Sequence, residues 1–286
     1  MSKKLILQKP DGYAVSAVLE IPEAPKGIVI AIHGFASSRE CATYQMLRRR
    51  LPAAGYGMIG IELPGHGTEE SSAEPLRVEG CINSIEAAER CAASAWPQLP
   101  VSYFASSFGA YLTGLYISTR AHGGRSAFFR SAAVNMPELF SFDENAPGTE
   151  EKRRWKAELE ERGYFITGEA LGKPMKVTRE FKEDLERHDL FRLFHPLPEG
   201  AHRIAMAHGA ADEVIDPEAA GRFSGKFGIP ITYFEGEGHS LGNDPGTPDK
   251  VADLAIALYD GKESICQHWR KSSKEEGASE HLTEPA

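Results

Sequence analysis

The chain has 286 residues, 41% of them hydrophobic, and a formal net charge of −9. This apolar content suffices for a folded core, and the acidic balance argues against a nucleic-acid-binding protein, which would carry a basic stripe. No stretch approaches the roughly 20 apolar residues that cross a bilayer, the N-terminus lacks a secretory pattern, and the four cysteines form no CxxC pair. We therefore expect a cytoplasmic protein without a membrane span, and the sequence leaves a homodimer open.

Short apolar segments alternate with longer helical patterns in the first half of the chain. The continuous apolar runs are typical of strands buried on both faces of a sheet. The first helical pattern ends at Gly55, and turn residues surround Asp11. The elements expected up to residue 136 are a hairpin at 4–8 and 13–21, strands at 27–33, 57–63, 101–105 and 131–136, and helices at 42–55, 78–96 and 108–119.

The pattern changes after Met136, where the chain becomes rich in charge and poor in β-branched residues. Helical periodicity continues, but no strand pattern is found until the α/β rhythm resumes. This organisation predicts an α/β fold with a mostly parallel sheet flanked by helices, and with one inserted helical segment. The later elements are helices at 149–163, 177–194, 217–227 and 251–259 and strands at 203–209 and 231–236; the expected core is 1–136 with 196–261, the insertion is 137–195, and 262–286 is a polar tail.

Two serines stand in segments similar to a nucleophile elbow, in which a serine occupies a sharp turn between a strand and a helix. Gly238–Gly242 matches the pattern G-x-S-x-G at Ser240, whereas Ala105–Gly109 has alanine in the first position before Ser107. Ser107 follows an apolar strand and precedes an apolar helix, which is the required frame. Ser240 precedes a run of Gly, Pro and Asp that cannot open a helix directly. We therefore predict Ser107 as the nucleophile.

A serine hydroxyl needs a histidine to accept its proton and a carboxylate to orient that histidine. Both groups are expected on loops that follow later strands of the sheet. Asp212 stands just beyond the predicted strand 203–209, and His239 follows the next strand in a glycine-rich loop. We predict Asp212 as the acid and His239 as the base. Asp216 lies near the same strand end and remains an alternative acid.

Attack on a carbonyl creates an oxyanion, which two backbone N–H groups can stabilise. One N–H is expected from Phe108, the residue after the nucleophile, at the start of a helix. The other is expected from Phe35, in the loop after the strand 27–33. His33 and His66 lie in loops beside these groups, and we interpret both as residues that hold backbone in place.

Together these motifs resemble the α/β-hydrolase-fold serine hydrolases, in the group of monoacylglycerol-lipase-like enzymes, serine aminopeptidases and bacterial cinnamoyl or feruloyl esterases. The resemblance implies an α/β-hydrolase fold with a cap inserted over the active site. It departs from the family pattern at Ala105, where glycine is usual, and at Glu62, where aspartate is common. It covers the chain from about Gly27 to Tyr259, and the matching segments are His33–Phe35, Pro64–Gly67, Ala105–Gly109, His208–Asp212 and Gly238–His239.

The sequence thus predicts a carboxylic ester hydrolase that forms an acyl-enzyme on Ser107. The expected partner is a small to medium ester, with aryl and hydroxycinnamoyl esters as candidates. An amino-terminal peptidase or amidase, an acyltransferase and a non-catalytic binding protein remain alternatives; the first would need an acidic subsite, for which Glu138, Asp143 and Glu144 are candidates. No cofactor or metal ion is expected, because no GxGxxG follows a strand and no residues have metal-ligand spacing.

The insertion also carries many aromatic residues. Most of them are expected to form its own small core, and a few to line an apolar pocket for the substrate. The sequence does not separate the two sets. These aromatic residues are Phe140, Phe142, Trp155, Tyr164, Phe165, Phe181, Phe191 and Phe194.

Overall fold

A computed structural model describes residues 2–67, 74–142, 149–195 and 203–262. Its centre is an eight-stranded sheet in the order β1-β2-β4-β3-β5-β6-β9-β10. The pairs β1–β2 and β2–β4 are antiparallel, and the other pairs are parallel. The strands are β1 (Ser2–Gln8), β2 (Ala14–Glu20), β3 (Gly27–Ile32), β4 (Tyr56–Ile61), β5 (Val101–Ser106), β6 (Gly124–Arg130), β9 (Arg203–Gly209) and β10 (Ile231–Phe234).

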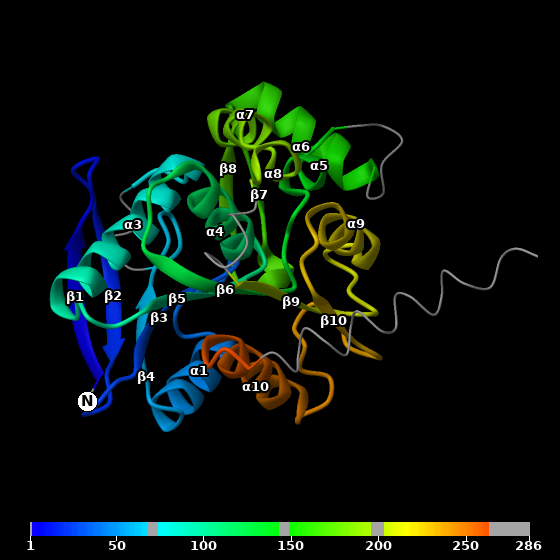
Figure 1. The fold of residues 1–286 in the computed structure, drawn as a ribbon. Coiled ribbons are helices and arrows are strands. Elements are labelled where there is room, and N and C mark those ends of the chain that lie inside the picture. Colours follow the sequence, from blue (N-terminus) through cyan, green and yellow to red (C-terminus); the bar gives the residue numbers. More distant parts are fainter. Residues whose placement is uncertain (1, 68–73, 143–148, 196–202, 263–286) are drawn as a thin grey trace, which may run out of the picture.

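Helices cover both faces of this sheet (Figure 1). Side chains alternate along each strand, so neighbouring residues enter different layers of the core. Phe104 packs with the layer of α1 and α10, whereas Tyr103 and Ala105 pack with the layer of α3 and α4. The predicted fold class, a mostly parallel sheet flanked by helices, is confirmed. The flanking helices are α1 (Ala42–Ala53), α3 (Val78–Ala95), α4 (Phe108–Thr119), α9 (Pro217–Phe227) and α10 (Thr247–Tyr259).

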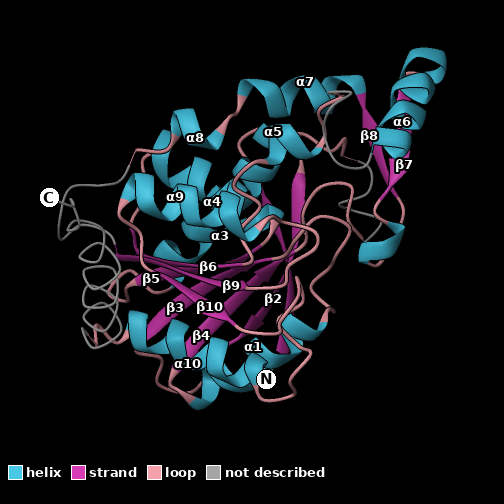
Figure 2. Cartoon of the chain, turned by 90° about the vertical axis from the view of Figure 1, so that its right-hand side faces the viewer, coloured by secondary structure: helices cyan, strands magenta, loops and turns pink. Residues whose placement is uncertain are grey.

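The chain leaves the sheet after β6 and returns to it at β9. We call residues 137–195, which lie between these two strands, the cap segment. Figure 2 shows its elements on the side of the sheet opposite α1 and α10. It is not purely helical, because β7 and β8 pair as a small antiparallel sheet. Its elements, with the first residue of α5 preceding it, are α5 (Met136–Leu139), α6 (Thr149–Arg162), β7 (Tyr164–Thr167), the 3₁₀ helix η1 (Glu169–Leu171), β8 (Met175–Thr178), α7 (Arg179–Arg187) and α8 (Leu190–Leu193).

Two elements predicted between residues 131 and 194 are wrong. The strand expected at 131–136 lies earlier, at β6, where the buried polar side chains of Ser126 and Arg130 interrupt the apolar run that marks a strand. The single helix expected at 177–194 is two helices. Thr178 and Asp189 accept hydrogen bonds from the backbone N–H groups at the start of α7 and α8, which separates them.

Aromatic side chains form the interior of the cap segment. Trp155 stacks on Phe165 with ring centroids 4.9 Å apart, and Phe140 lies against both. Phe140 and Phe181 reach the core through Phe35 and Phe108. No helix of the described residues is long and apolar enough to cross a membrane. Of the predicted polar tail, residues 263–286 lie outside the described residues, as do Asp143 and Glu144.

Candidate active site

The turn between β5 and α4 holds Ser107 in a backbone conformation that is rare for a residue with a side chain. Its φ is 52° and its ψ is −117°. The turn packs tightly against the end of β3, the neighbouring strand in the sheet, since a Cβ added to Gly109 would lie 2.5 Å from the carbonyl oxygen of His33. Gly34 also allows a close approach, because an added Cβ there would lie 3.1 Å from Cβ of Ser107. This sharp turn presents the Ser107 hydroxyl at the carboxyl edge of the sheet.

Three side chains from three different loops meet at this edge. Oγ of Ser107 lies 3.1 Å from Nε2 of His239, and Nδ1 of His239 lies 2.9 Å from Oδ2 of Asp212. With the proton on Nδ1, the imidazole donates to the carboxylate and accepts the serine proton at Nε2. The arrangement has the geometry of a nucleophile, a base and an orienting acid.

Asp212 is held by more groups than the sequence indicates. Its Oδ1 accepts the N–H groups of Val214 and Ile215, each at 2.9 Å. The fully buried His208 lies with Nε2 3.2 Å from Oδ2, and this histidine was not predicted as part of the site. Burial opposes ionisation, but hydrogen bonds from His208 and His239 hold the pKa of Asp212 well below its usual range. The carboxylate is therefore charged at neutral pH.

Two side chains at the end of β6 bond the backbone of the loop that carries His239. Oγ of Ser131 donates to the carbonyl oxygen of His239 at 2.9 Å, and the guanidinium of Arg130 donates to that of Ser240. The buried carboxylate of Glu237 accepts two backbone N–H groups from the far side of the same loop. None of these three polar groups was found by sequence reasoning; Arg130 and Ser131 bond a segment more than 100 residues away, and Glu237 bonds backbone of its own loop.

Two backbone N–H groups near the serine have no acceptor among the described residues: those of Phe35 and Phe108. Phe108 is the first residue of α4, whose dipole adds positive potential at that N–H. Phe35 follows Gly34, which packs directly against Ser107. Unused donors on both sides of the nucleophile are what an oxyanion hole requires.

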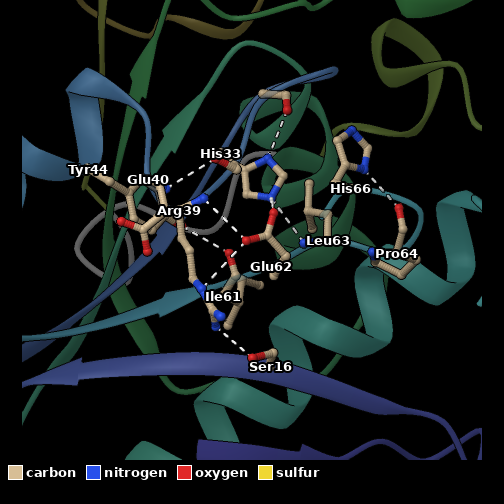
Figure 3. Close-up of polar contacts among 12 residues, drawn as sticks. Ser16, His33, Arg39, Glu40, Tyr44, Ile61, Glu62, Leu63, Pro64 and His66 are labelled. Atoms are coloured by element: carbon tan, nitrogen blue, oxygen red, sulfur yellow. Dashed lines mark hydrogen bonds and ion pairs between the residues drawn. The ribbon is translucent and has the colours of Figure 1, made fainter. Parts of the chain in front are cut away.

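A buried polar network holds the Gly34–Phe35 peptide (Figure 3). Nδ1 of His33 donates to the carbonyl oxygen of Gly34 at 2.9 Å, and Nε2 accepts the N–H of Leu63 at 3.0 Å. Oε1 of Glu62 lies 3.3 Å from the same Nε2, and its other oxygen faces Arg39. Because Gly34 C=O and Phe35 N–H belong to one peptide plane, the imidazole of His33 also fixes the direction of that N–H.

The other candidates from the sequence occupy supporting positions. His66 bonds the carbonyl oxygen of Pro64 at 2.8 Å, and burial followed by the nearby His33 lowers its pKa well below the ordinary value. Asp216 caps α9 through the N–H of Glu218 and makes no contact with His239. Ser240 is exposed in a loop, and the next helix, α10, begins only at Thr247.

A pocket of about 420 Å³ opens beside the serine. The cap segment reaches it through the exposed tip of η1, at Ala170 and Leu171, rather than through the aromatic residues named in the sequence. This tip is held on the Phe35 loop, since a Cβ added to Gly168 would lie 2.8 Å from that of Ala36. No three His, Cys, Asp or Glu side chains in the described parts of the chain gather closely enough to hold a metal ion.

Comparisons with known proteins agree with this architecture. A family model described as serine aminopeptidase, S33, matches residues 23–193, more than half of the chain. A search of curated proteins found no match.

Solved structures of similar fold include a putative hydrolase from Agrobacterium vitis S4, with 18% identity and a TM-score of 0.70 over 90% of this chain and 98% of that one. Est1E from Butyrivibrio proteoclasticus with bound ferulic acid has 16% identity and a TM-score of 0.70, over 90% and 99%. An esterase domain from a Rhodothermus marinus protein has 17% identity and a TM-score of 0.65, over 91% and 98%. At these identities the likeness shows the fold alone.

Proposed function

Since the chain belongs to the serine aminopeptidase S33 family of α/β hydrolases and is a hydrolase, we propose that it cleaves a small to medium carboxylic ester through an acyl-enzyme on Ser107. The observation that carries this proposal is the continuous contact from Ser107 Oγ through His239 to Asp212, at 3.1 and 2.9 Å. A serine that only capped a helix would not need a charged acid behind its histidine.

The proposed reaction begins when Oγ of Ser107 attacks the ester carbonyl carbon while Nε2 of His239 accepts the hydroxyl proton. The ionised Asp212 stabilises the imidazolium that forms. The N–H groups of Phe35 and Phe108 stabilise the negative charge on the carbonyl oxygen. The C–O bond then breaks, and the leaving alcohol takes the proton from His239. Water attacks the acyl-enzyme by the same route in reverse and releases the carboxylic acid.

The cap segment has a proposed role in substrate choice. Its η1 tip lines the pocket beside Ser107, and its aromatic interior packs on Phe35 and Phe108. We propose that residues 137–195 form a cap on the core made by the rest of the described chain, and that the tip limits the size of the bound ester. Est1E, a protein of similar fold, has been solved with ferulic acid bound, which makes hydroxycinnamoyl esters a reasonable class to assay.

An amino-terminal peptidase is the second candidate, because the family description names an aminopeptidase and because the exposed carboxylate of Glu213 lines the pocket. A panel of substrates separates the two. We expect turnover of p-nitrophenyl acetate, p-nitrophenyl butyrate or methyl ferulate, with little or none of alanyl- and leucyl-p-nitroanilide. Cleavage of the anilides with no cleavage of the esters would reverse the ranking.

A further inference from the structure

Arg130, the last residue of β6, is a buried cation without an ion-pair partner. Arg130 is only 8% exposed, and in the described part of the chain its guanidinium forms one hydrogen bond, to the neutral carbonyl oxygen of Ser240. The carboxylates whose charges it senses, Asp212 and Glu237, are bound by other groups. Among the described residues, no Asp or Glu forms an ion pair with Arg130. The two carboxylates therefore stabilise the charge of Arg130 through space, but neither forms a direct ion pair with it.

Arg130 lies in the wall of the pocket beside the nucleophile. Arg130, Ser240 and Ser107 all line this pocket. The guanidinium nitrogens that do not bond Ser240 have no partner among the described residues, and they are not among the fully enclosed polar atoms that lack one, so they keep some accessible surface. The backbone of Arg130 adjoins the nucleophile, because the N–H of Ser107 donates to the carbonyl oxygen of Arg130 at 2.9 Å.

Arg130 stays charged at neutral pH, and a helix N-terminus adds positive potential to the same pocket. Burial lowers its pKa to about 10, so the group is still protonated at neutral pH. Helix α1 begins at Ala42, which lines the same pocket, and the N-terminal end of a helix is positive. A buried charge without a direct ion pair is costly, and the planar fork of a guanidinium matches the two oxygens of a carboxylate. Arg130 in the pocket wall thus fits an anionic group of a ligand.

We propose that Arg130 binds a carboxylate of the substrate, so that the preferred ester is an anionic one with a carboxylate a few bonds from its scissile carbonyl. This inference rests on the proposed ester hydrolysis at Ser107. It also disfavours an ammonium group in this pocket, because the guanidinium would repel it. The exposed Glu213 at the pocket rim does not neutralise Arg130, since no ion pair joins them among the described residues.

Two pairs of esters test this preference at fixed ionic strength. One pair is monomethyl adipate and its monoamide, with the anion on the acyl side. The other is 3-carboxyphenyl butyrate and 3-carbamoylphenyl butyrate, with the anion on the leaving group. We expect the wild-type protein to favour the carboxylate member of at least one pair by about tenfold in kcat/KM, as for a charge-assisted hydrogen bond.

Variants separate a bound substrate anion from a purely structural role. Arg130→Gln keeps a donor for the Ser240 carbonyl and removes the charge, so the preference should fall to about one, whereas Arg130→Lys should keep part of it. Ser131→Ala is the matched control, because Ser131 bonds the adjacent carbonyl of the same loop. It should slow both members of a pair equally. An unchanged preference in Arg130→Gln would overturn the proposal.

A binding measurement keeps this test separate from the proposed function. Adipate should raise the Tm of the wild-type protein but not that of Arg130→Gln, and adipamide should raise neither. Ester turnover without any carboxylate preference would overturn the role of Arg130 and leave the proposed hydrolysis standing. Absence of turnover with an adipate effect that needs Arg130 would contradict the hydrolysis and support the anion site. An adipate effect equal in both proteins would contradict the anion site.

Discussion

The side chains proposed to do the chemistry were predictable because each stands where a strand pattern ends. Ser107, Asp212 and His239 follow three strands whose carboxyl ends share one edge of the sheet. The polar residues that hold them were not predictable. Ser131 bonds the carbonyl of His239 across 108 positions of sequence, and such a pairing leaves no local pattern.

His33 gives a test of the oxyanion peptide at the scale of one residue. Its imidazole bonds the carbonyl oxygen of Gly34, so His33→Ala should leave the Phe35 N–H in place but poorly oriented. Loss of a whole donor costs about 10²–10³ in kcat, so we expect a smaller decrease, about tenfold, with KM little changed. Steady-state kinetics on p-nitrophenyl butyrate measures both constants.

The conservative variant His33→Asn provides the control for this test. Its side-chain amide can occupy the position of Nδ1 and donate to the same carbonyl, so part of the lost kcat should return. If both variants changed KM while kcat stayed at the wild-type value, His33 would act in substrate binding and the positioning role would be wrong.

At the scale of elements, the errors of sequence reasoning have two physical causes, buried polar residues and short strands. Periodicity finds strands that are apolar throughout, such as β3 and β4, but β6 carries buried Ser126 and Arg130 and was displaced to 131–136. The hairpin of β7 and β8 was missed because each strand has only four residues. Tertiary contacts, which a local pattern does not record, decide the state of such short segments.

One carboxylate adds a polar link to the aromatic contacts between the cap segment and the core. Oδ2 of Asp184, on α7, accepts the N–H of Val78 at 2.6 Å, where α3 begins without a side-chain cap of its own. His188 pairs with the same carboxylate, and this hydrogen bond raises the pKa of His188. Burial opposes ionisation of Asp184, but the bonds from His188 and Val78 lower its pKa. Both groups are therefore favoured in their charged forms.

This pair should give the stability of the protein a defined pH dependence. The contribution of His188 to the free energy of unfolding is fully present below about pH 6.5, the pKa of a histidine in the unfolded chain. It is lost as the pH rises through the raised pKa of His188 in the folded protein. The contribution of Asp184 is present above about pH 3.9 and is lost as the pH falls through its lowered folded pKa. The stabilisation is thus greatest in weak acid, between about pH 4 and 6.5.

Urea unfolding of His188→Gln and of Asp184→Asn from pH 5 to 9 measures this effect. The wild-type advantage over His188→Gln should shrink as the pH rises, whereas Asp184→Asn should cost about 1–2 kcal/mol, because α3 loses its charged cap. A difference between wild type and His188→Gln that stayed constant from pH 5 to 9 would show that the pair does not stabilise the junction.

At the scale of the whole molecule, the parallel sheet is what makes the site possible. Central strands β3 and β5 end together, which sets Gly34 against Ser107, and β9 and β10 bring the acid and the base to the same edge. The alternation of strands and helices in the sequence predicts this arrangement. It does not predict that Arg130 lines the pocket beside Ser107, because that depends on three-dimensional packing.

The central claim is that Ser107, activated by His239, is the nucleophile. The most direct measurement is labelling with a fluorophosphonate, followed by mass spectrometry of the modified peptide. The label should be on Ser107, should be lost in Ser107→Ala and strongly reduced in His239→Ala, and should remain in the matched control Ser240→Ala. A label on Ser240, or equal labelling of Ser107→Ala and wild type, would contradict the account.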